Sequence, residues 1–82
     1  MYAIEFTPKS EKIFLKLDPE VKERITVALE RIRIRPHAFV KKLVESSYFR
    51  YRVWDYRIIM DIKKDKLIIF LIEITHRSTV YQ

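Results

Sequence analysis

Two arginines near the middle of the chain have the type and spacing to hold nucleic-acid phosphates. Side chains alternate along a strand, so a strand over residues 48–53 would turn Arg50 and Arg52 to one face and Tyr51 to the other. The rise per residue places the two guanidinium groups about 7 Å apart, close to the spacing of successive phosphates along one nucleic-acid strand. Arg57 can reach the same face from the next strand. This arrangement favours a surface for a polyanion over an ordinary polar sheet face.

A second set of reactive side chains follows the most hydrophobic run of the sequence. His76 and Arg77 stand directly after residues 67–74. A histidine at a strand end can transfer a proton, and an arginine can neutralise a phosphate, although most single histidines are not catalytic. Tyr81 is the penultimate residue, and an aromatic side chain near a terminus is expected to dock on the core or on a ligand.

The net charge of +6 lies in the central third of the chain. Residues 31–57 contain eight basic and two acidic side chains, whereas the rest of the chain has as many acidic as basic residues. This segregation favours an anionic partner over a merely well-solvated surface. Lys41 and Lys42 are expected to bind RNA together with Arg50 and Arg52.

The composition excludes several classes of site. Without cysteine, the chain has no disulfide, no thiolate metal ligand and no cysteine nucleophile. Its two histidines, His37 and His76, are far apart in the sequence, so neither a metal nor another cofactor is expected. The N-terminal segment has no apolar signal core, and the run Leu67–Ile72 is too short to cross a bilayer. A cytoplasmic location without membrane contact is therefore expected.

Two helices are expected in the first half of the chain. Thr7-Pro8 and Asp18-Pro19 each combine an N-cap residue with a proline at the first helical position. Pro36 is expected to end the second helix, because the residue before a proline avoids the α conformation. The short connection favours an antiparallel helical hairpin. The second helix carries the clearest apolar stripe, formed by Val21, Ile25, Ala28, Leu29 and Ile32.

The remaining pattern is that of strands and turns. Residues 2–6, 48–53, 57–62 and 67–74 predict strands, and residues 37–47 predict a loop. Since the chain has no glycine, the turns are expected to avoid positive φ or to use Asp there. The predicted fold is α+β in one domain, residues 1–82, with the order β-α-α-β-β-β. In this fold the N-terminal helical hairpin packs on one face of a mainly antiparallel four-stranded sheet, and the other face stays free for function.

The central hairpin and the C-terminal segment together resemble a known family. The run from Phe49 to Ile59, FRYRVWDYRII, is similar to the hairpin motif of the RelE/ParE superfamily of toxins from type II toxin–antitoxin modules. The run from Ile74 to Tyr81, ITHRSTVY, is similar to the C-terminal motif of that family. Lys42-Leu43 resembles the basic–leucine pair before the second strand. The expected order of elements also matches, so the resemblance covers nearly the whole chain and implies a RelE-like fold.

The resemblance to the RelE branch implies an mRNA interferase. Such an endoribonuclease enters the A site of a 70S-type ribosome, cleaves mRNA without a metal and inhibits translation. The 2′-OH attacks the adjacent phosphate, which requires a base, an acid and cations for the pentavalent charge. A small RelB-like antitoxin with an acidic segment is the implied partner. The site positions of the family correspond here to Arg50, Arg52, Arg57, Arg77 and Tyr81, with Arg57 and Arg77 on the scissile phosphate and Tyr81 on a substrate base.

The chain departs from the family pattern at several positions. Arg50 and Arg52 stand where lysine is frequent, and an arginine stays protonated, so it does not easily act as a base. Either catalysis is mainly electrostatic and positional, or His76 takes the proton. Trp54 stands where the hairpin usually has glycine, and Thr75 where glycine usually precedes His-Arg. Trp54 offers a stacking or antitoxin-binding surface, unless it simply packs in the turn.

Two alternatives stay open beside the endoribonuclease. A ParE-like toxin of the same fold would inhibit DNA gyrase, and a non-catalytic module would bind RNA and leave it intact. The basic residues occur as a set together with Tyr81, and the ParE branch lacks that set. The resemblance therefore favours the RelE branch.

Overall fold

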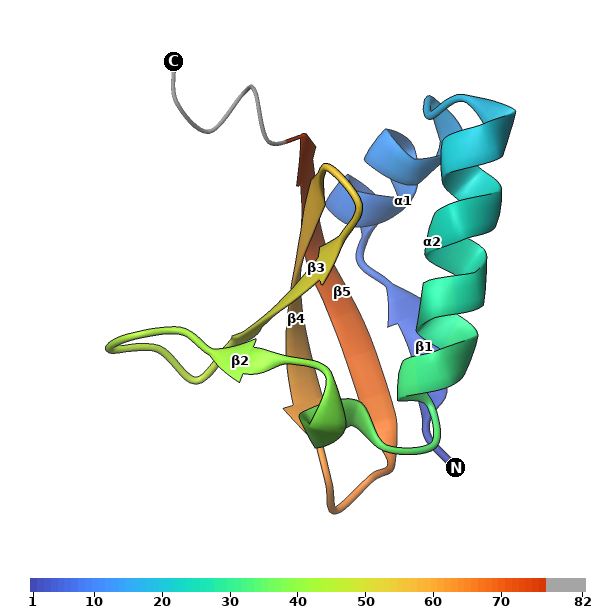
Figure 1. Ribbon diagram of the computed structural model, residues 1–82. Helices are drawn as coiled ribbons and strands as arrows, with labels where there is room; N and C mark the ends of the chain where they lie inside the picture. Colours follow the sequence, from blue (N-terminus) through green and yellow to red (C-terminus); the bar gives the residue numbers. More distant parts are fainter. Residues whose placement is uncertain (77–82) are drawn as a thin grey trace.

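Two helices begin at the predicted residues in the structure, a computed structural model that describes residues 1–76 (Figure 1). Helix α1 (Pro8–Leu15) has Thr7 as its N-cap, and Thr7 Oγ1 accepts a hydrogen bond from the backbone N–H of Ser10 at 3.3 Å. Helix α2 (Pro19–Ile32) follows Asp18, whose side chain makes no capping hydrogen bond. Within residues 1–76, no helix is long and apolar enough to cross a membrane.

Helix α2 ends at Ile32, before the predicted end at Pro36. The backbone oxygen of Arg33 accepts a hydrogen bond from Tyr2 N at 2.8 Å, and Arg33 Nε donates to Tyr2 O at 2.9 Å. These two bonds tie the end of the helix to the start of the first strand, so the chain turns there. A short 3-10 helix, η1 (Pro36–Ala38), follows.

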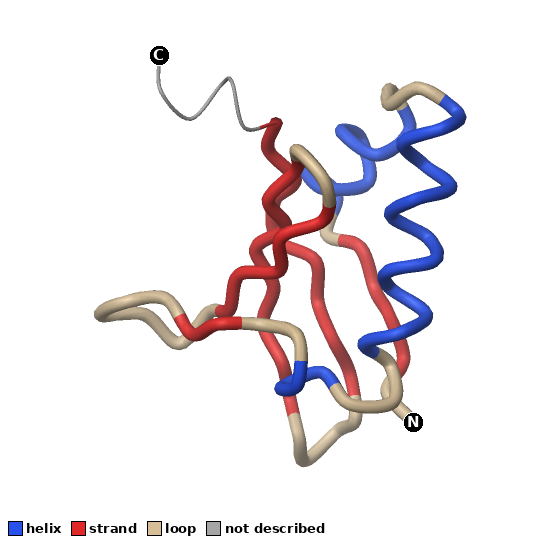
Figure 2. The backbone as a smooth tube through the Cα atoms, viewed as in Figure 1, coloured by secondary structure: helices blue, strands red, loops and turns tan. Residues whose placement is uncertain are grey.

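The strands form one sheet in the order β1-β5-β4-β3-β2 (Figures 1 and 2). β1 pairs with β5 in parallel, and the other neighbours are antiparallel, so the α+β class and the mainly antiparallel sheet are confirmed. The bounds are Ala3–Phe6 for β1, Lys41–Lys42 for β2, Phe49–Val53 for β3, Tyr56–Lys63 for β4 and Ile68–His76 for β5.

The sheet has five strands rather than the predicted four, because β2 lies within residues 37–47, which were expected to form a loop. Lys41 pairs with Arg50 and Lys42 with Phe49. Two exposed lysines have no apolar alternation from which a strand is predicted. Only their pairing with β3, which is a tertiary contact, makes them a strand.

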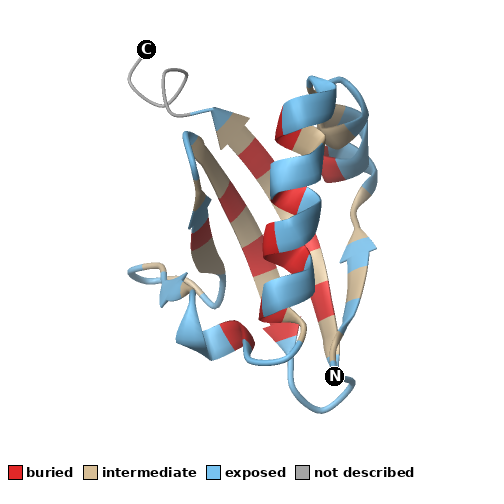
Figure 3. Ribbon diagram, turned by 45° about the vertical axis from the view of Figure 1, so that its right-hand side comes forward, coloured by how far each residue is buried: buried red, intermediate tan, exposed pale blue. Residues whose placement is uncertain are grey.

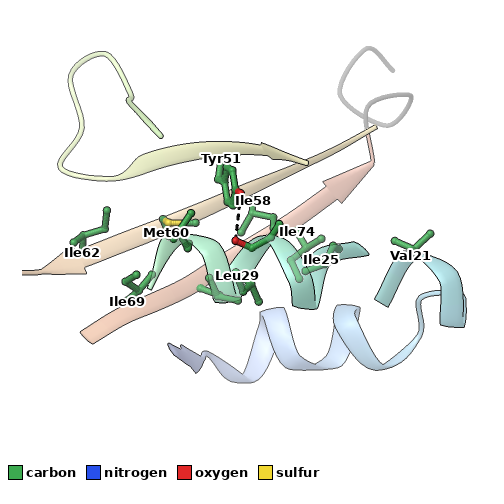
Figure 4. Close-up of a cluster of buried hydrophobic side chains, with 12 residues drawn as sticks. Val21, Ile25, Leu29, Tyr51, Ile58, Met60, Ile62, Ile69 and Ile74 are labelled. Carbon is green, nitrogen blue, oxygen red and sulfur yellow. Dashed lines mark hydrogen bonds between the residues drawn. The ribbon is translucent and has the colours of Figure 1, made fainter. Parts of the chain in front are cut away.

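The core lies between α2 and one face of the sheet (Figures 3 and 4). All five residues of the predicted α2 stripe are buried. Tyr51 Oη donates a hydrogen bond to the backbone oxygen of Ala28 at 3.2 Å, which joins β3 to α2. The buried strand residues that meet the helix are Tyr51, Ile58, Met60, Ile62, Ile69, Leu71 and Ile74.

Three residues of the described part have positive φ. The turns were expected to avoid positive φ or to use Asp there, and none of the three is an Asp, so this prediction is wrong. They are Glu45 (56°), Trp54 (56°) and Leu67 (55°). Trp54 lies in the β3–β4 turn and Leu67 just before β5. A side chain with a Cβ in the left-handed region costs about 1 kcal/mol. The tight connections impose this conformation whichever residue occupies the position.

Candidate nucleic-acid interface

The register of the strands brings four basic side chains to one face of the sheet. Arg52 lies directly opposite Arg57 on β4, and Arg50 lies opposite Lys41 on β2. Tyr51, between the two β3 arginines, points to the other face, where it is only 5% exposed. Because directly opposed residues share a face, the four side chains lie on the side away from the helices. The name basic face is used below for Lys41, Arg50, Arg52 and Arg57.

The helices leave the basic face uncovered. Both α1 and α2 lie on the side of the sheet that carries the core (Figure 4). Pairs of rings hold η1 and the residue after it on this same side, since His37 contacts Phe49 and Phe39 contacts Tyr51. Among residues 1–76, no helix covers the opposite side (Figure 1). Within the described residues, the basic face is therefore open to a large ligand.

Like charges oppose each other on the basic face. Directly opposite side chains of antiparallel strands have Cβ atoms about 4.5–5.5 Å apart, and like charges in such a pair destabilise a sheet. Arg52 and Arg57 form such a pair. No salt bridge joins Arg50, Arg52 or Arg57 to an acidic side chain within residues 1–76. A bound polyanion would offset this repulsion, as a phosphate backbone does.

The acidic side chains of the central strands are already paired with lysines. Asp61 Oδ2 lies 3.3 Å from Lys63 Nζ, and Glu73 Oε2 lies 3.5 Å from Lys9 Nζ. The register of β4 and β5 shifts between Ile59 and Met60. One residue of β5, next to Glu73, therefore has no partner on β4. No three His, Asp or Glu side chains of the described part are grouped to hold a metal ion. The basic face thus offers a ligand positive charge and hydrogen-bond donors.

The structure does not bring all predicted site residues to the basic face. Lys42 lies opposite Phe49, which packs against the core, so Lys42 is on the helix side. His76 lies opposite Tyr56, and their ring centroids are 4.9 Å apart in an edge-to-face contact. Tyr56 also packs against the core, so the side chain of His76 is on the other side from Arg57. The predicted residues Arg77 and Tyr81 lie outside the described residues.

A groove runs between α2 and the free edge of β3. Because β2 pairs only with Phe49 and Arg50, the rest of β3 has no strand on that side. The groove has a volume of about 760 Å³. The name edge groove is used below for this cavity, which is lined by Glu20, Glu23, Arg24, Val27, Ala28, Arg31, Phe39, Tyr51, Arg52, Val53 and Trp54.

Two arginine side chains lie over aromatic rings in the edge groove. The guanidinium carbon of Arg24 lies 4.5 Å from the ring centre of Trp54, and that of Arg31 lies 5.9 Å from the ring centre of Phe39. Trp54 is 55% exposed and Phe39 45%. Both distances are those of cation–π pairs. Arg24 also forms an ion pair within α2, since its Nη2 lies 3.5 Å from Glu20 Oε1.

The buried phenol of Tyr51 forms part of the groove floor. Burial raises the pKa of Tyr51 above its ordinary value, and the nearby Arg31 guanidinium opposes this rise by favouring the phenolate. The Tyr51 hydroxyl is thus held neutral as a hydrogen-bond donor to α2.

Sequence patterns did not reveal the edge groove. Arg24, Arg31 and Phe39 come from α2 and from the segment after η1, and only folding brings them beside β3. One signal was present: Trp54 occupies a hairpin position at which glycine is usual. The structure shows why glycine is usual at this position, since the φ of 56° is one that glycine adopts without strain.

A family model matches residues 4–81 of the chain. The family is described as "ParE toxin of type II toxin-antitoxin system, parDE". No curated protein matches the sequence. Since the match spans nearly all of the chain, it includes the basic face, the edge groove, Arg77 and Tyr81.

Several solved structures have a similar fold. The toxin–antitoxin complex RelBE2 from Mycobacterium tuberculosis has a TM-score of 0.85 and 22% identity, covering 93% of this chain and 98% of that one. The isolated RelE toxin of E. coli has a TM-score of 0.81 and 23% identity, covering 99% and 92%. The RelE–RelB complex from Pyrococcus horikoshii has a TM-score of 0.79 and 20% identity, covering 93% and 94%.

Proposed function

The chain belongs to the ParE toxin family of type II toxin–antitoxin systems, and we propose that this toxin is a ribosome-dependent, metal-independent endoribonuclease that cleaves mRNA. Its fold is that of the RelE toxins. The observation that carries the proposal is the basic face, where three arginines and a lysine share an uncovered surface without acidic partners in the described part. In this proposal residues 1–82 act as one toxin domain in the cytoplasm.

In the proposed reaction the 2′-oxygen attacks the neighbouring phosphorus and forms a 2′,3′-cyclic phosphate as the bond to the 5′-oxygen breaks, while the proton of the 2′-OH passes to water and the departing 5′-oxygen takes up a proton from water. Negative charge develops on the phosphate oxygens, and guanidinium groups that are already in place stabilise it without reorganisation. Arg52 and Arg57 are directly opposed on the basic face. In our proposal Arg57 and Arg77 hold the scissile phosphate, Arg50, Arg52 and Lys41 bind the RNA backbone from the basic face, and Tyr81 orients a substrate base.

The arginines of the basic face do not readily remove the proton from the 2′-OH. Arg50 and Arg52 stay protonated at any physiological pH. The side chain of His76 lies against Tyr56 on the side of the sheet away from Arg57. This geometry favours electrostatic and positional catalysis, with the reacting groups aligned by the ribosome-bound RNA. His76 as the base is the second choice.

The proposed partners follow from the family and from the charge. Three of the similar structures are RelE toxins bound to RelB antitoxins from different organisms. For this chain we propose a small RelB-like antitoxin whose acidic segment folds onto the basic face and neutralises it. The 70S-type ribosome and its mRNA are the proposed target.

Gyrase inhibition is the second candidate, because the matching family is described by its ParE toxins. The basic face favours RNA as the target. Its positive side chains are gathered on one surface and repel one another in the free protein, which is expected where phosphates bind. A DNA supercoiling assay with purified gyrase separates the candidates. Inhibited supercoiling together with intact mRNA would favour the gyrase inhibitor.

The deciding experiment is a bacterial translation extract in which mRNA ends are mapped. The wild-type protein should cut mRNA only where ribosomes occupy it. Arg57→Ala and Arg77→Ala should each reduce the cleavage rate by about a hundredfold, the cost of removing a charged donor from such a transition state. Lys64→Ala, in the distant β4–β5 turn, is the matched control and should cut at the wild-type rate. Intact mRNA with the wild-type protein would refute the proposal.

A further inference from the structure

Trp54 occupies a strained and exposed position. Its φ of 56° lies in the left-handed region, where glycine fits without cost and a bulky residue does not. Burial does not explain its presence, since the residue is 55% exposed. The hairpin imposes this φ on any residue at the position, as the β4–β5 turn does on Leu67, so neither packing nor backbone geometry accounts for a tryptophan here. The surroundings of the ring therefore indicate what Trp54 contacts.

The edge groove beside Trp54 has the chemistry of a single-stranded nucleic-acid site. Such sites combine aromatic rings, on which bases stack, with cationic side chains that follow the backbone. Trp54 and Phe39 are the exposed rings of this groove, and each has an arginine guanidinium over one face of its ring, which leaves the other face of Trp54 for a base. Three arginines and two glutamates line the groove, so it carries net positive charge.

Arg52 connects the edge groove to the basic face. Arg52 is among the residues that line the groove, and its register places it opposite Arg57 on the basic face. The edge of β3 that separates the two surfaces has no strand partner beyond Arg50. A strand of RNA with one phosphate at the basic face can thus pass Arg52 and continue into the groove. Since RNA is already the proposed ligand of the basic face, it is also the occupant that this continuity favours.

We propose that the edge groove is a subsite for an RNA nucleotide flanking the cleaved phosphodiester, and that the base of this nucleotide stacks on Trp54. Arg31 and Arg52 contact the adjoining phosphates. Glu23 has no salt-bridge partner within residues 1–76 and can accept hydrogen bonds from amino groups of the base. The inference rests on the proposed RNA cleavage for the identity of its ligand. Trp54 acts in it as a specificity-determining residue.

The sole tryptophan of the chain makes the stack directly observable. Trp54 is the only tryptophan, so fluorescence excited beyond tyrosine absorption reports on this site alone. A short single-stranded RNA is titrated into the wild-type protein at low salt, without ribosomes, and polyphosphate serves as an anion without bases. Stacking should quench the fluorescence with RNA, whereas polyphosphate should bind and leave most of the fluorescence unchanged.

Two glycine substitutions separate stacking from backbone strain. Trp54→Gly removes the ring and relieves the positive φ, so the protein should fold at least as stably as the wild type. Its affinity for a dye-labelled RNA should fall about tenfold, the usual effect of losing one stacked base. Leu67→Gly relieves the same strain in the β4–β5 turn and should keep wild-type RNA affinity. In the translation extract, Trp54→Gly should change the preferred cleavage sites while cutting continues.

The outcomes distinguish this inference from the proposed function. Quenching by RNA supports the subsite whether or not the protein cuts mRNA. Absent quenching, or equal RNA affinity of Trp54→Gly and Leu67→Gly, would overturn the subsite even if mRNA is cut. An acidic peptide that quenches Trp54 where RNA does not would overturn it as well and would assign the groove to a protein partner.

Discussion

At the scale of single residues, the side-chain types determine what the basic face can offer a ligand. Arginine at positions 50 and 52 gives a charge that no physiological pH removes. Such a surface binds and stabilises phosphate, and it contributes little to proton transfer. By contrast, Tyr51 between them is buried and neutral, so one strand carries charge on one face and core on the other.

The pH dependence of stability follows from Tyr51. Burial raises the pKa of the folded-state phenol above the ordinary value near 10 that applies in the unfolded chain, so the unfolded chain loses this proton first. Tyr51 therefore stabilises the fold fully below about pH 10, and this contribution is lost as pH rises through the folded-state pKa. Tyr51→Phe should remove this alkaline loss and cost about 1 kcal/mol at neutral pH through the hydrogen bond to Ala28.

Urea unfolding at neutral and alkaline pH measures both effects. Tyr48→Phe is the control, because Tyr48 is exposed and the substitution should leave the pH profile unchanged. Parallel profiles for Tyr51→Phe and the wild type would contradict the assignment.

At the scale of elements, one capping cluster joins α1 to the sheet. Besides capping the helix, Thr7 Oγ1 donates to the backbone oxygen of Leu71 at 2.8 Å. The buried Ser10 Oγ donates to the same oxygen at 2.7 Å. Thr7 thus holds the helix at the point where the pairing of β1 with β5 ends. The basic face depends on this junction indirectly, since β5 supports β4 and β4 carries Arg57.

The two N-caps are therefore expected to differ in their contribution to stability. Thr7→Ala should lower the free energy of unfolding by about 1–2 kcal/mol, because both its capping bond and its bond to β5 are lost. Asp18→Ala should cost less, since Asp18 makes no side-chain capping bond. Chemical denaturation of the two variants gives the comparison, and equal losses would contradict this account of the junction.

At the scale of the whole molecule, charge and core occupy opposite sides of one sheet. The helices use one face for the core, so the residues that alternate with the core residues are left on an open face. Net positive charge of this kind destabilises the free protein slightly and speeds association with a polyanion. The distribution predicts that binding to RNA depends steeply on salt.

This salt dependence can be assigned to individual charges. The logarithm of RNA affinity should fall linearly with the logarithm of salt concentration, and Lys41→Ala should reduce the slope by about 0.7, the value for one phosphate contact on a single strand. Lys64→Ala, an exposed lysine outside the basic face, should leave the slope unchanged. Titrations of labelled RNA at several salt concentrations give both slopes. Identical slopes for wild type and Lys41→Ala would remove Lys41 from the interface.

Local rules determined much of this protein from its sequence alone. The starts of α1 and α2, the buried stripe of α2 and the opposite directions of Tyr51 and Arg52 follow from capping chemistry and side-chain periodicity, which act within a few residues. The membership in a toxin superfamily followed from two short motifs. Each of these properties needs no knowledge of which segments meet in space.

The tertiary structure decided what depends on contacts between distant segments. β2 exists only because Lys41 and Lys42 pair with β3, and its short length leaves open the edge beside which the groove forms. The place of His76 beside Tyr56 follows from the β4–β5 register, which no local pattern reports. The positive φ of Trp54 arises from closing a tight hairpin without glycine. Backbone closure and strand pairing, rather than side-chain preference, therefore shaped the two surfaces to which function is assigned.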